Sequence, residues 1–258
     1  MEKLKSIGAQ LYTARSCFET VDEGKRTLEA IKKMGYDTVQ VSGITTLSYE
    51  QLAPMIREAG LSVCGTHTDL EKAMENPSEA MRLHDLLGTK VMGTGGFFPA
   101  EMKASYFRDF IDKANAFAAV IAKEGFRFTY HNHSHEFLRE DGVLFMDLLA
   151  DGLDPKTTGF VLDTYWIAHG GGDVRYWIEK LAGRIPILHL KDMMRLWKEG
   201  EPPQAYTEVG RGNLYWKGII ESGIKAGVEN FVVELDVCPG HPLDSLKISA
   251  DYLRANFM

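Results

Sequence analysis

The repeating unit of this chain is clearest in Gly125-Phe-Arg-Phe-Thr-Tyr-His-Asn-His-Ser-His-Glu136. Gly125 is typical of a residue that ends a helix just before a strand. The short, largely apolar run that begins at Phe126 predicts a buried strand. Histidines and a carboxylate come directly after it, where the strand is expected to end. The segment therefore predicts the end of a helix, a strand and a polar strand end, in this order.

The same succession of strand, loop and amphipathic helix recurs eight times in 258 residues, or about 32 residues per unit (258 divided by eight). Strands are predicted to begin near Ser6, Asp37, Leu61, Thr89, Phe126, Gly159, Ile185 and Asn230. Helices are predicted near 21–34, 48–59, 76–88, 102–124, 141–150, 173–183, 214–227 and 242–256. Strands that alternate with helices of this length imply parallel βαβ units.

Eight such units predict an α/β protein with a single closed (β/α)8 TIM barrel over residues 1–258. Barrels of this kind typically have about 250 residues, which leaves no room for a second domain. An open, doubly wound sheet is the alternative. It is disfavoured because no Gly-x-Gly-x-x-Gly motif follows the first strand.

Helix-capping residues support these boundaries. Thr20 with Glu23 resembles a capping box, and Ser48 is a suitable N-cap for the second helix. Gly88 and Gly125 each stand where a helix is expected to give way to a strand. The predicted helices therefore begin and end at residues that favour such ends.

Composition and charge exclude several classes of protein. With 45% hydrophobic and 25% charged residues, the chain is typical of a folded globular protein. Its formal net charge of −7 argues against nucleic acid as a partner. The sequence contains no apolar run of 18 residues and no secretory leader pattern, so we expect a cytoplasmic protein without a membrane span. Cys17, Cys64 and Cys238 are widely spaced and predict reduced thiols.

Ionisable side chains are concentrated at the predicted ends of strands five to eight. In a (β/α)8 barrel these ends form one mouth, where catalytic groups are found. Asp163, His189 and Glu234 each follow a short apolar run. An imidazole and two carboxylates suit Mn²⁺, Fe²⁺, Co²⁺, Zn²⁺ or Mg²⁺. Each acid alone is more often an ion-pair partner or a helix N-cap, but the recurrence on adjacent strands favours a metal or catalytic site.

The order of these motifs resembles the sugar-phosphate isomerase/epimerase family, whose members have a xylose isomerase-like TIM barrel. The resemblance covers nearly the whole chain, and it is more specific for the superfamily than for the substrate. The matching segments are Gln10-Leu-Tyr-Thr-Ala-Arg15, Tyr130-His-Asn-His-Ser-His-Glu-Phe137, Leu162-Asp-Thr-Tyr-Trp166, Gly170-Gly-Gly-Asp173, Arg184-Ile-Pro-Ile-Leu-His-Leu-Lys-Asp192, Glu208-Val-Gly-Arg-Gly212, Val233-Glu-Leu-Asp236, Pro242-Leu-Asp-Ser-Leu246 and Tyr252-Leu253.

The resemblance implies a divalent metal ion (Mn, Mg, Co, Fe or Zn) held by groups from strands five to eight. Asp163, His189 and Glu234 match three of the ligand positions. The strand-five ligand of the family is usually a glutamate at the end of the strand, and this chain departs from that pattern.

At the strand-five position the chain has His131 and His133, and Glu136 follows a few residues later. Glu136 could reach back from the loop as the fourth ligand, an imidazole could replace it, or the site could be weak. We predict Glu136 as the fourth metal ligand.

The reaction implied by the resemblance is isomerisation or epimerisation of a sugar or sugar phosphate. A proton moves next to a carbonyl through an enediolate that the metal stabilises. Members of the family use the metal-binding glutamates of strands five and eight on opposite faces of the substrate. In this chain we expect Glu234 to form the acid/base pair with His131 or His133, because an imidazole titrates near neutral pH.

Three alternative functions stay open. Relatives that act as inosose dehydratases or 3-keto-sugar eliminases are similar, so the same site is compatible with β-elimination. The missing strand-five glutamate is compatible with a non-catalytic sugar-binding subunit. A phosphodiesterase like endonuclease IV needs more histidine ligands and a basic DNA-binding face, and the net charge of −7 disfavours it.

Five further residues are candidate substrate contacts. His67 ends strand three, where the resemblance places a histidine in the pocket wall; a core histidine is the alternative. Lys191 could bind a substrate oxygen or form an ion pair with Asp163, Glu234 or Asp236. Tyr12 could bind sugar hydroxyls, and Trp166 could stack on a sugar ring, although core packing would also explain both. Arg211 could bind a phosphate group, or belong to an ordinary turn.

The connection 192–213 is long for a compact domain, and such loops are usually functional or mobile. Its polar middle, residues 198–203, is predicted to be a lid or a solvated loop. A homodimer is compatible with the sequence.

Overall fold

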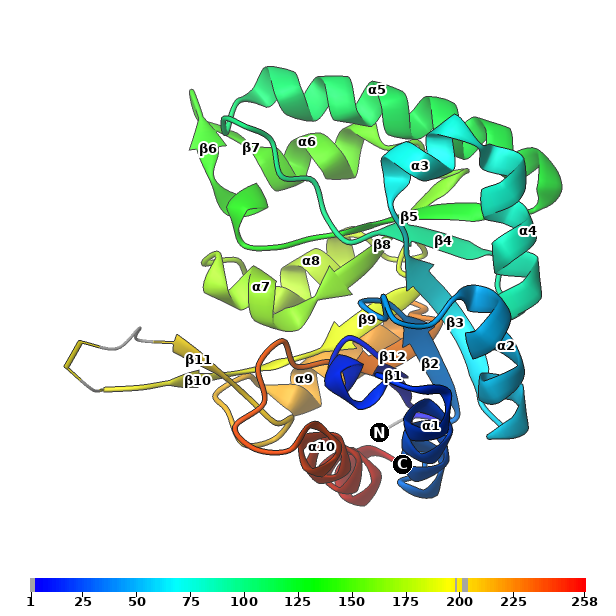
Figure 1. Cartoon of the computed structure of the whole chain (residues 1–258). Helices are drawn as coiled ribbons and strands as arrows, with labels where there is room; N and C mark the ends of the chain where they lie inside the picture. Colours follow the sequence, from blue (N-terminus) through cyan, green and yellow to red (C-terminus); the bar gives the residue numbers. More distant parts are fainter. Residues whose placement is uncertain (1–2, 198, 201–203) are drawn as a thin grey trace.

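The computed structural model describes residues 3–197, 199–200 and 204–258. Parallel strands form a closed barrel in the order β1-β12-β9-β8-β5-β4-β3-β2 (Figure 1). These strands are β1 (Gly8–Gln10), β2 (Thr38–Val41), β3 (Ser62–His67), β4 (Val91–Thr94), β5 (Arg127–His131), β8 (Thr158–Asp163), β9 (Ile187–Leu190) and β12 (Asn230–Val233). The predicted (β/α)8 barrel is confirmed.

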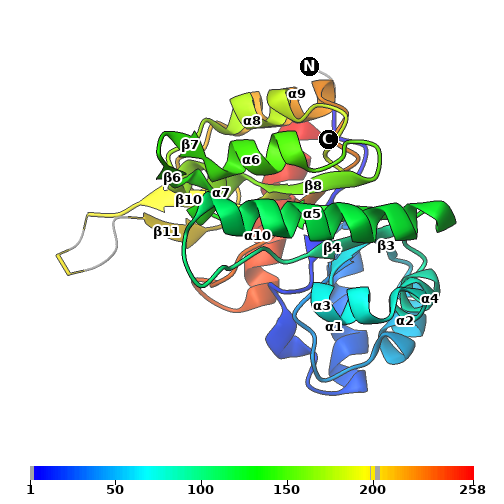
Figure 2. The same cartoon turned by 90° about the horizontal axis from the view of Figure 1, so that it is seen from above.

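Helices surround the barrel and pack on its outer face, as two perpendicular views show (Figures 1 and 2). Each predicted helix is present within a few residues of its expected bounds. They are α1 (Val21–Lys33), α2 (Tyr49–Glu58), α4 (Pro77–Leu87), α5 (Ala104–Ile121), α6 (Phe145–Gly152), α8 (Val174–Lys180), α9 (Trp216–Lys225) and α10 (Pro242–Phe257).

The predicted helix caps are present. The Thr20 hydroxyl accepts a hydrogen bond from the Glu23 N–H at 3.3 Å. Ser48 and Gln51 form a capping box at the start of α2. Gly125 has a φ of +78°, which is the left-handed conformation expected of a glycine that ends a helix.

Apolar side chains pack both outside and inside the barrel. On the outside, Phe107 of α5 stacks on Phe145 of α6, with 4.6 Å between ring centroids. A separate small cluster contains Cys64, Val161, Ile187 and Val232. Three of its members precede the ionisable groups of the strand ends by two residues, so both sets share the inward face of their strands. The apolar cluster therefore supports the polar mouth from within the barrel.

Several elements lie outside the predicted units. The short helices α3 (Leu70–Glu75) and α7 (Thr164–His169) follow β3 and β8, and the short strands β6 (Arg139–Glu140) and β7 (Val143–Leu144) form a hairpin. They are too short to leave a clear periodic pattern in the sequence.

The long connection after β9 contains an antiparallel hairpin of β10 (Asp192–Arg195) and β11 (Gln204–Thr207). This hairpin projects from the barrel in both views (Figures 1 and 2). The lid or solvated loop predicted over 198–203 lies mostly outside the described residues, since 198 and 201–203 are among those not described. None of the helices in the described part of the chain is long and apolar enough to cross a membrane.

Candidate active site

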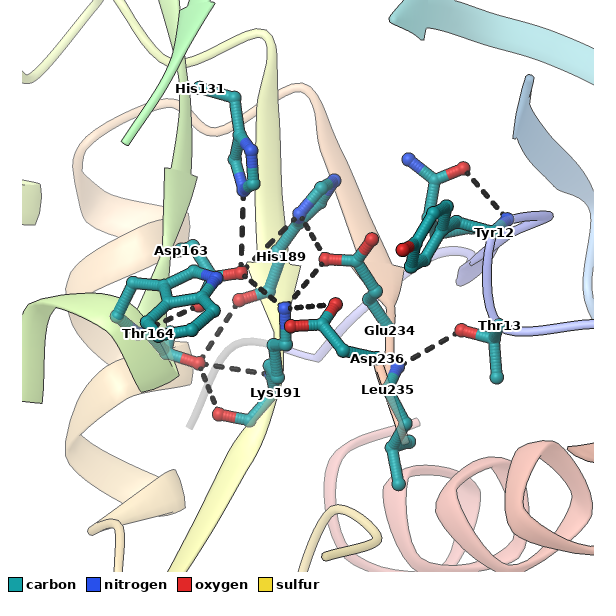
Figure 3. A network of polar contacts seen from close by, with 12 residues as sticks. Tyr12, Thr13, His131, Asp163, Thr164, His189, Lys191, Glu234, Leu235 and Asp236 are labelled. Carbon is teal, nitrogen blue, oxygen red and sulfur yellow. Dashed lines mark hydrogen bonds and ion pairs between the residues drawn. The ribbon is translucent and has the colours of Figure 1, made fainter. Parts of the chain in front are cut away.

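Four ionisable side chains meet at the mouth of the barrel, on strands that are consecutive in its order (Figure 3). His131 is the last residue of β5, Asp163 ends β8, His189 lies on β9, and Glu234 directly follows β12. One ligand atom from each of the four lies within 4.8 Å of the others, and all four residues are buried. The group of four could hold a metal ion.

Asp163 is positioned by one hydrogen bond from its backbone N–H and another to its carboxylate. Its N–H donates to Asn132 Oδ1 at 2.9 Å, and its Oδ1 accepts from the Trp166 N–H at 3.0 Å as the N-cap of α7. Its Oδ2 lies 3.4 Å from His131 Nε2 and 3.6 Å from His189 Nδ1. One oxygen therefore caps a helix while the other faces the cluster.

Lys191 supplies a buried positive charge beside the cluster. Its Nζ lies 3.3 Å from Asp163 Oδ2, 3.1 Å from Glu234 Oε2 and 2.7 Å from Asp236 Oδ1. Burial disfavours its charge, but attraction to these carboxylates outweighs burial and raises the pKa of Lys191. In the same way, burial works against the Glu234 carboxylate, but Lys191 and His189 hold its pKa well below the usual range. The three N–H donors of the ammonium face three carboxylates.

His189 offers the most direct test of whether a metal ion fits the cluster. Its Nδ1 is buried, lies 2.9 Å from Glu234 Oε2, and has no hydrogen-bond partner among the described residues. A nitrogen lone pair beside carboxylate oxygens is unfavourable unless a cation or a proton lies between them. Two imidazoles with two carboxylates are suitable donors for a divalent transition metal. The residues present fit such an ion.

A cavity of about 210 Å³ opens beside the cluster. Its lining residues are Tyr12, Ser42, His67, Gly95, His131, His133, Glu234 and Asp236. The ring of His67 stacks on that of His131 at 4.8 Å between centroids, and His131 lies 4.7 Å from His133. Burial lowers the pKa of His133 to about 2, with a further contribution from His131, and burial also holds the pKa of His67 well below its usual range. The lining of the cavity therefore includes the neutral imidazoles of His67 and His133 together with the carboxylates of Glu234 and Asp236.

A family model described as xylose isomerase-like TIM barrel matches residues 28–256 of this sequence. The chain belongs to this family. Proteins similar to this chain include a sugar phosphate isomerase/epimerase, an L-ribulose 3-epimerase and inosose dehydratases.

Three similar proteins show how far the likeness extends. An inosose dehydratase from Mesomycoplasma hyopneumoniae (strain 7448) is 23% identical over 164 residues, which cover 58% of this chain and 54% of the relative. A crystal structure of a sugar phosphate isomerase/epimerase from Parabacteroides distasonis ATCC 8503 has a TM-score of 0.82 at 23% identity, covering 97% of this chain and 93% of that one. An L-ribulose 3-epimerase structure has a TM-score of 0.72 at 15% identity, covering 98% and 94%. At these identities the structural likeness establishes the fold, and the chain spans about half the length of the dehydratase.

Within this xylose isomerase-like barrel, the structure does not bring Glu136 to the cluster, contrary to the predicted ligand set. Glu136 is fully buried, and its carboxylate accepts hydrogen bonds from the Tyr130 hydroxyl at 2.7 Å and the His133 N–H at 2.8 Å. Successive side chains of a strand point to opposite faces, so Tyr130 points outward, where its ring contacts Phe110 of α5, while His131 points inward. Glu136 is held on the Tyr130 side, and His131 lies at the position expected of Glu136.

The other predicted site residues fall into two groups. Tyr12, His67, His131, His133 and Glu234 line the cavity. Three residues are not among those that line it: Trp166, Lys191 and Arg211.

Each of these three has a different environment. Trp166 is partly buried, with its ring 5.1 Å from that of His133 and 5.1 Å from Lys191 Nζ. Lys191 forms the ion pairs that were the alternative to a substrate contact. Arg211 has a side chain that is 57% exposed and lies 3.7 Å from the Glu208 carboxylate.

From the sequence, Asp236 was expected only as a possible ion-pair partner of Lys191, and no role was predicted for Gln40 or Asn132. In the structure Asp236 pairs with Lys191, Gln40 contacts His189, and Asn132 contacts Asp163. Asp236 could have been found from its spacing, because residues two apart on a strand end share a face with Glu234. Gln40 and Asn132 act across the barrel or between strands, and no local pattern in the sequence reveals such partners.

Proposed function

We propose that this protein is a metal-dependent isomerase or epimerase of a small sugar. It would remove a proton from the carbon next to a carbonyl, form an enediolate and return a proton. The observation that supports this most directly is the buried group of His131, Asp163, His189 and Glu234 beside a cavity lined by further proton-transfer groups. These four residues would hold the metal ion, which when bound would polarise the substrate carbonyl as a Lewis acid.

Glu234 would be the proton-transfer group on one side of the cavity. Its Oε2 makes the contacts with Lys191 and His189. Neither ion pair involves its Oε1, which leaves that oxygen for a substrate proton. The charged form is maintained because Lys191 and His189 oppose the effect of burial on its pKa. Glu234 therefore enters the reaction as a base.

His133 would be the partner on the other side. Its low pKa keeps the imidazole neutral, and its Nδ1 is buried without a hydrogen-bond partner among the described residues. β5 and β12 are separated in the barrel by β8 and β9, so His133 and Glu234 approach a bound substrate from different directions. Epimerisation needs this arrangement, because Glu234 removes a proton on one face and the neutral imidazole donates its N–H proton on the other. Glu234 then releases its proton to solvent, and the imidazole regains one.

The charges around the cavity favour a substrate without phosphate. Glu234 and Asp236 line it, and the three N–H donors of Lys191 face carboxylates. Arg15, near the same mouth, donates to the carbonyl oxygens of Tyr12 and Asp236. An added phosphate would thus meet carboxylates rather than unpaired basic side chains in the described lining, so we propose an uncharged sugar or cyclitol.

Solvent exchange tests this proposal. Metal-loaded protein would be incubated in D₂O with a panel of neutral ketoses, keto-inositols and the corresponding phosphates, and followed by proton NMR. We expect loss of the signal of a hydrogen next to the carbonyl, together with a new isomer or epimer, and faster exchange for the neutral member of each pair. Glu234→Gln should slow the exchange at least 100-fold. If protein with bound metal exchanges no proton on any member of the panel, the proposed reaction is wrong.

β-Elimination is the second candidate, and one feature favours it. The proposed proton-transfer groups on the two sides differ in chemistry, since Glu234 is a carboxylate and His133 is an imidazole. Elimination of water uses such an unequal pair, because one group removes a proton and another protonates the departing hydroxyl. The matched relatives include inosose dehydratases. In the same NMR experiment, loss of water and an unsaturated ketone absorbing in the ultraviolet would identify this reaction.

A further inference from the structure

A hydrogen bond across the barrel interior connects Gln40 of β2 to His189 of β9. Gln40 Oε1 lies 2.6 Å from His189 Nε2, and both residues are fully buried. The two residues are 149 positions apart in the chain, so only barrel closure brings them together. Gln40 does not belong to the group of four and is not among the residues that line the cavity.

The chemistry of this contact determines which nitrogen of His189 is free. An imidazole that binds a metal ion is neutral and carries one N–H. An amide oxygen can only accept, so in that form the hydrogen bond to Gln40 places the remaining proton on Nε2. The lone pair is then on Nδ1, the nitrogen that lies 2.9 Å from Glu234 Oε2 and 3.6 Å from Asp163 Oδ2. The side-chain amide nitrogen of Gln40, Nε2, has no hydrogen-bond partner among the described residues.

We infer that Gln40 is a positioning residue, which selects Nδ1 of His189 as the metal-binding atom and holds the ring in that orientation. The inference rests on the proposed function, since it takes His189 as a ligand. Outer partners of metal-binding histidines typically change metal affinity by about 10–100-fold when they are removed. Gln40 would act in this way from the opposite wall of the barrel.

The other tautomer of His189, which has its proton on Nδ1, shows why an acceptor at Nε2 is needed. Without an acceptor at Nε2, the imidazole proton is better placed on Nδ1, where it can be donated to the Glu234 carboxylate. That proton would occupy the nitrogen which faces the metal position. Gln40 stabilises the tautomer that leaves Nδ1 available.

Three variants test the inference by metal affinity. Gln40→Met preserves length but removes the acceptor, and we expect it to weaken Zn²⁺ or Mn²⁺ binding by about 10–100-fold in titration calorimetry. Gln40→Glu keeps an acceptor at this position and should bind within a few-fold of the wild type. Gln10→Met is the matched control: Gln10 is the buried neighbour of Gln40 in the β1–β2 register, and its Oε1 accepts from the Tyr12 N–H rather than from His189. We expect its metal affinity to be unchanged.

A spectroscopic measurement separates positioning from general damage to the fold. In the zinc-saturated wild type, long-range ¹H–¹⁵N correlation should show that His189 has a protonated Nε2 and a metal-bound Nδ1. A metal-bound Nε2, or equal affinity of Gln40→Met and the wild type, would overturn the inference while leaving the proposed function intact. If the wild type itself binds neither metal, the proposed function fails first. Thermal unfolding of each variant establishes that the compared proteins are folded.

Discussion

At the scale of single residues, Asp163 shows how one side chain serves both the fold and the candidate site. Its Oδ1 caps α7 and its Oδ2 faces the cluster. The sequence left two interpretations open for such an acid, a helix cap and a site residue, and the structure supports both geometries at once. A carboxylate has two oxygens, so the two interpretations do not compete.

Glu136 should be important for stability but not for metal binding. Glu136→Gln should leave metal affinity within a few-fold of the wild type, because the carboxylate faces Tyr130 and the His133 N–H rather than the cluster. It should lower the free energy of unfolding by about 1–3 kcal/mol, because an amide has one acceptor oxygen for two buried donors. Denaturant unfolding and calorimetric titration measure the two effects. A large loss of metal affinity with unchanged stability would instead restore Glu136 as a ligand.

Lys191 should be important for stability before metal is added. Lys191→Met leaves three carboxylates facing one another, and breaking buried ion pairs of this kind costs about 3–5 kcal/mol. Lys217→Met is the control, because Lys217 pairs with Glu221 on the surface and its side chain is 59% exposed, so we expect a loss below about 1 kcal/mol. Urea unfolding of metal-free protein compares the two. Equal losses would show that the buried pairs add nothing beyond a surface pair.

The titration of His189 should make the stability of the metal-free protein depend on pH. Burial opposes its charge, but Glu234 and Asp163 raise its pKa to about 9 from an ordinary value of 6.5. Because the folded-state pKa is the higher one, the stability that this group contributes is complete below pH 6.5 and is lost as the pH rises through about 9. The loss is up to about 3 kcal/mol, and it should be absent in His189→Asn. Unfolding free energies between pH 6 and 10 measure it, and a parallel profile for the variant would contradict the assignment.

At the scale of elements, one carboxylate organises the segment between β11 and α9. Asp192, the first residue of β10, accepts hydrogen bonds from the N–H groups of Gly210 at 2.9 Å and Gly212 at 3.0 Å, and from Trp216 Nε1 at 2.6 Å. The segment carrying Arg211 is thus tied to the base of the hairpin. None of residues 208–212 is among the residues that line the cavity.

Gly212 lies close to Asp192 in this turn, so a larger residue there should lower stability, and Gly240 is a suitable control. A Cβ at Gly212 would lie 2.3 Å from Asp192 Oδ1, whereas a Cβ at Gly240 would meet nothing within 4 Å. Neither has a positive φ, so the pair differs in packing rather than in backbone strain. We expect Gly212→Ala to lower the free energy of unfolding by about 1–3 kcal/mol and Gly240→Ala to leave it nearly unchanged. Thermal or urea unfolding measures both, and similar stabilities would show that the turn adapts.

At the scale of the whole molecule, barrel closure concentrates charge from strands far apart in the chain. Asp163, Glu234 and Asp236 share one mouth with a single described ammonium, that of Lys191, in contact with them. A divalent ion bound there would reduce the repulsion among the carboxylates. Folding and metal binding are therefore expected to be coupled.

Metal removal tests this coupling. Dialysis against a chelator should lower the melting temperature, and adding Mn²⁺ or Zn²⁺ back at about 100 times its dissociation constant should stabilise the protein by about 2.7 kcal/mol. Glu234→Gln should reduce that gain. Differential scanning calorimetry measures the shifts. An unchanged melting temperature at saturating metal would argue against an ion held by the folded barrel.

The amino-acid sequence alone predicted the repeating strand–helix units, the helix caps and the residue types at each strand end. These follow from local chemistry: apolar periodicity, capping side chains and glycines at left-handed turns. Because parallel strands of a barrel end at one mouth, it also predicted that Asp163, His189 and Glu234 would meet. Tertiary structure alone decided that His131 rather than Glu136 completes the group, that Lys191 is fully paired, and that Gln40 reaches His189. Those outcomes depend on which face of β5 binds Tyr130 and on contacts across the closed barrel, and the spacing of residues along a chain does not encode either.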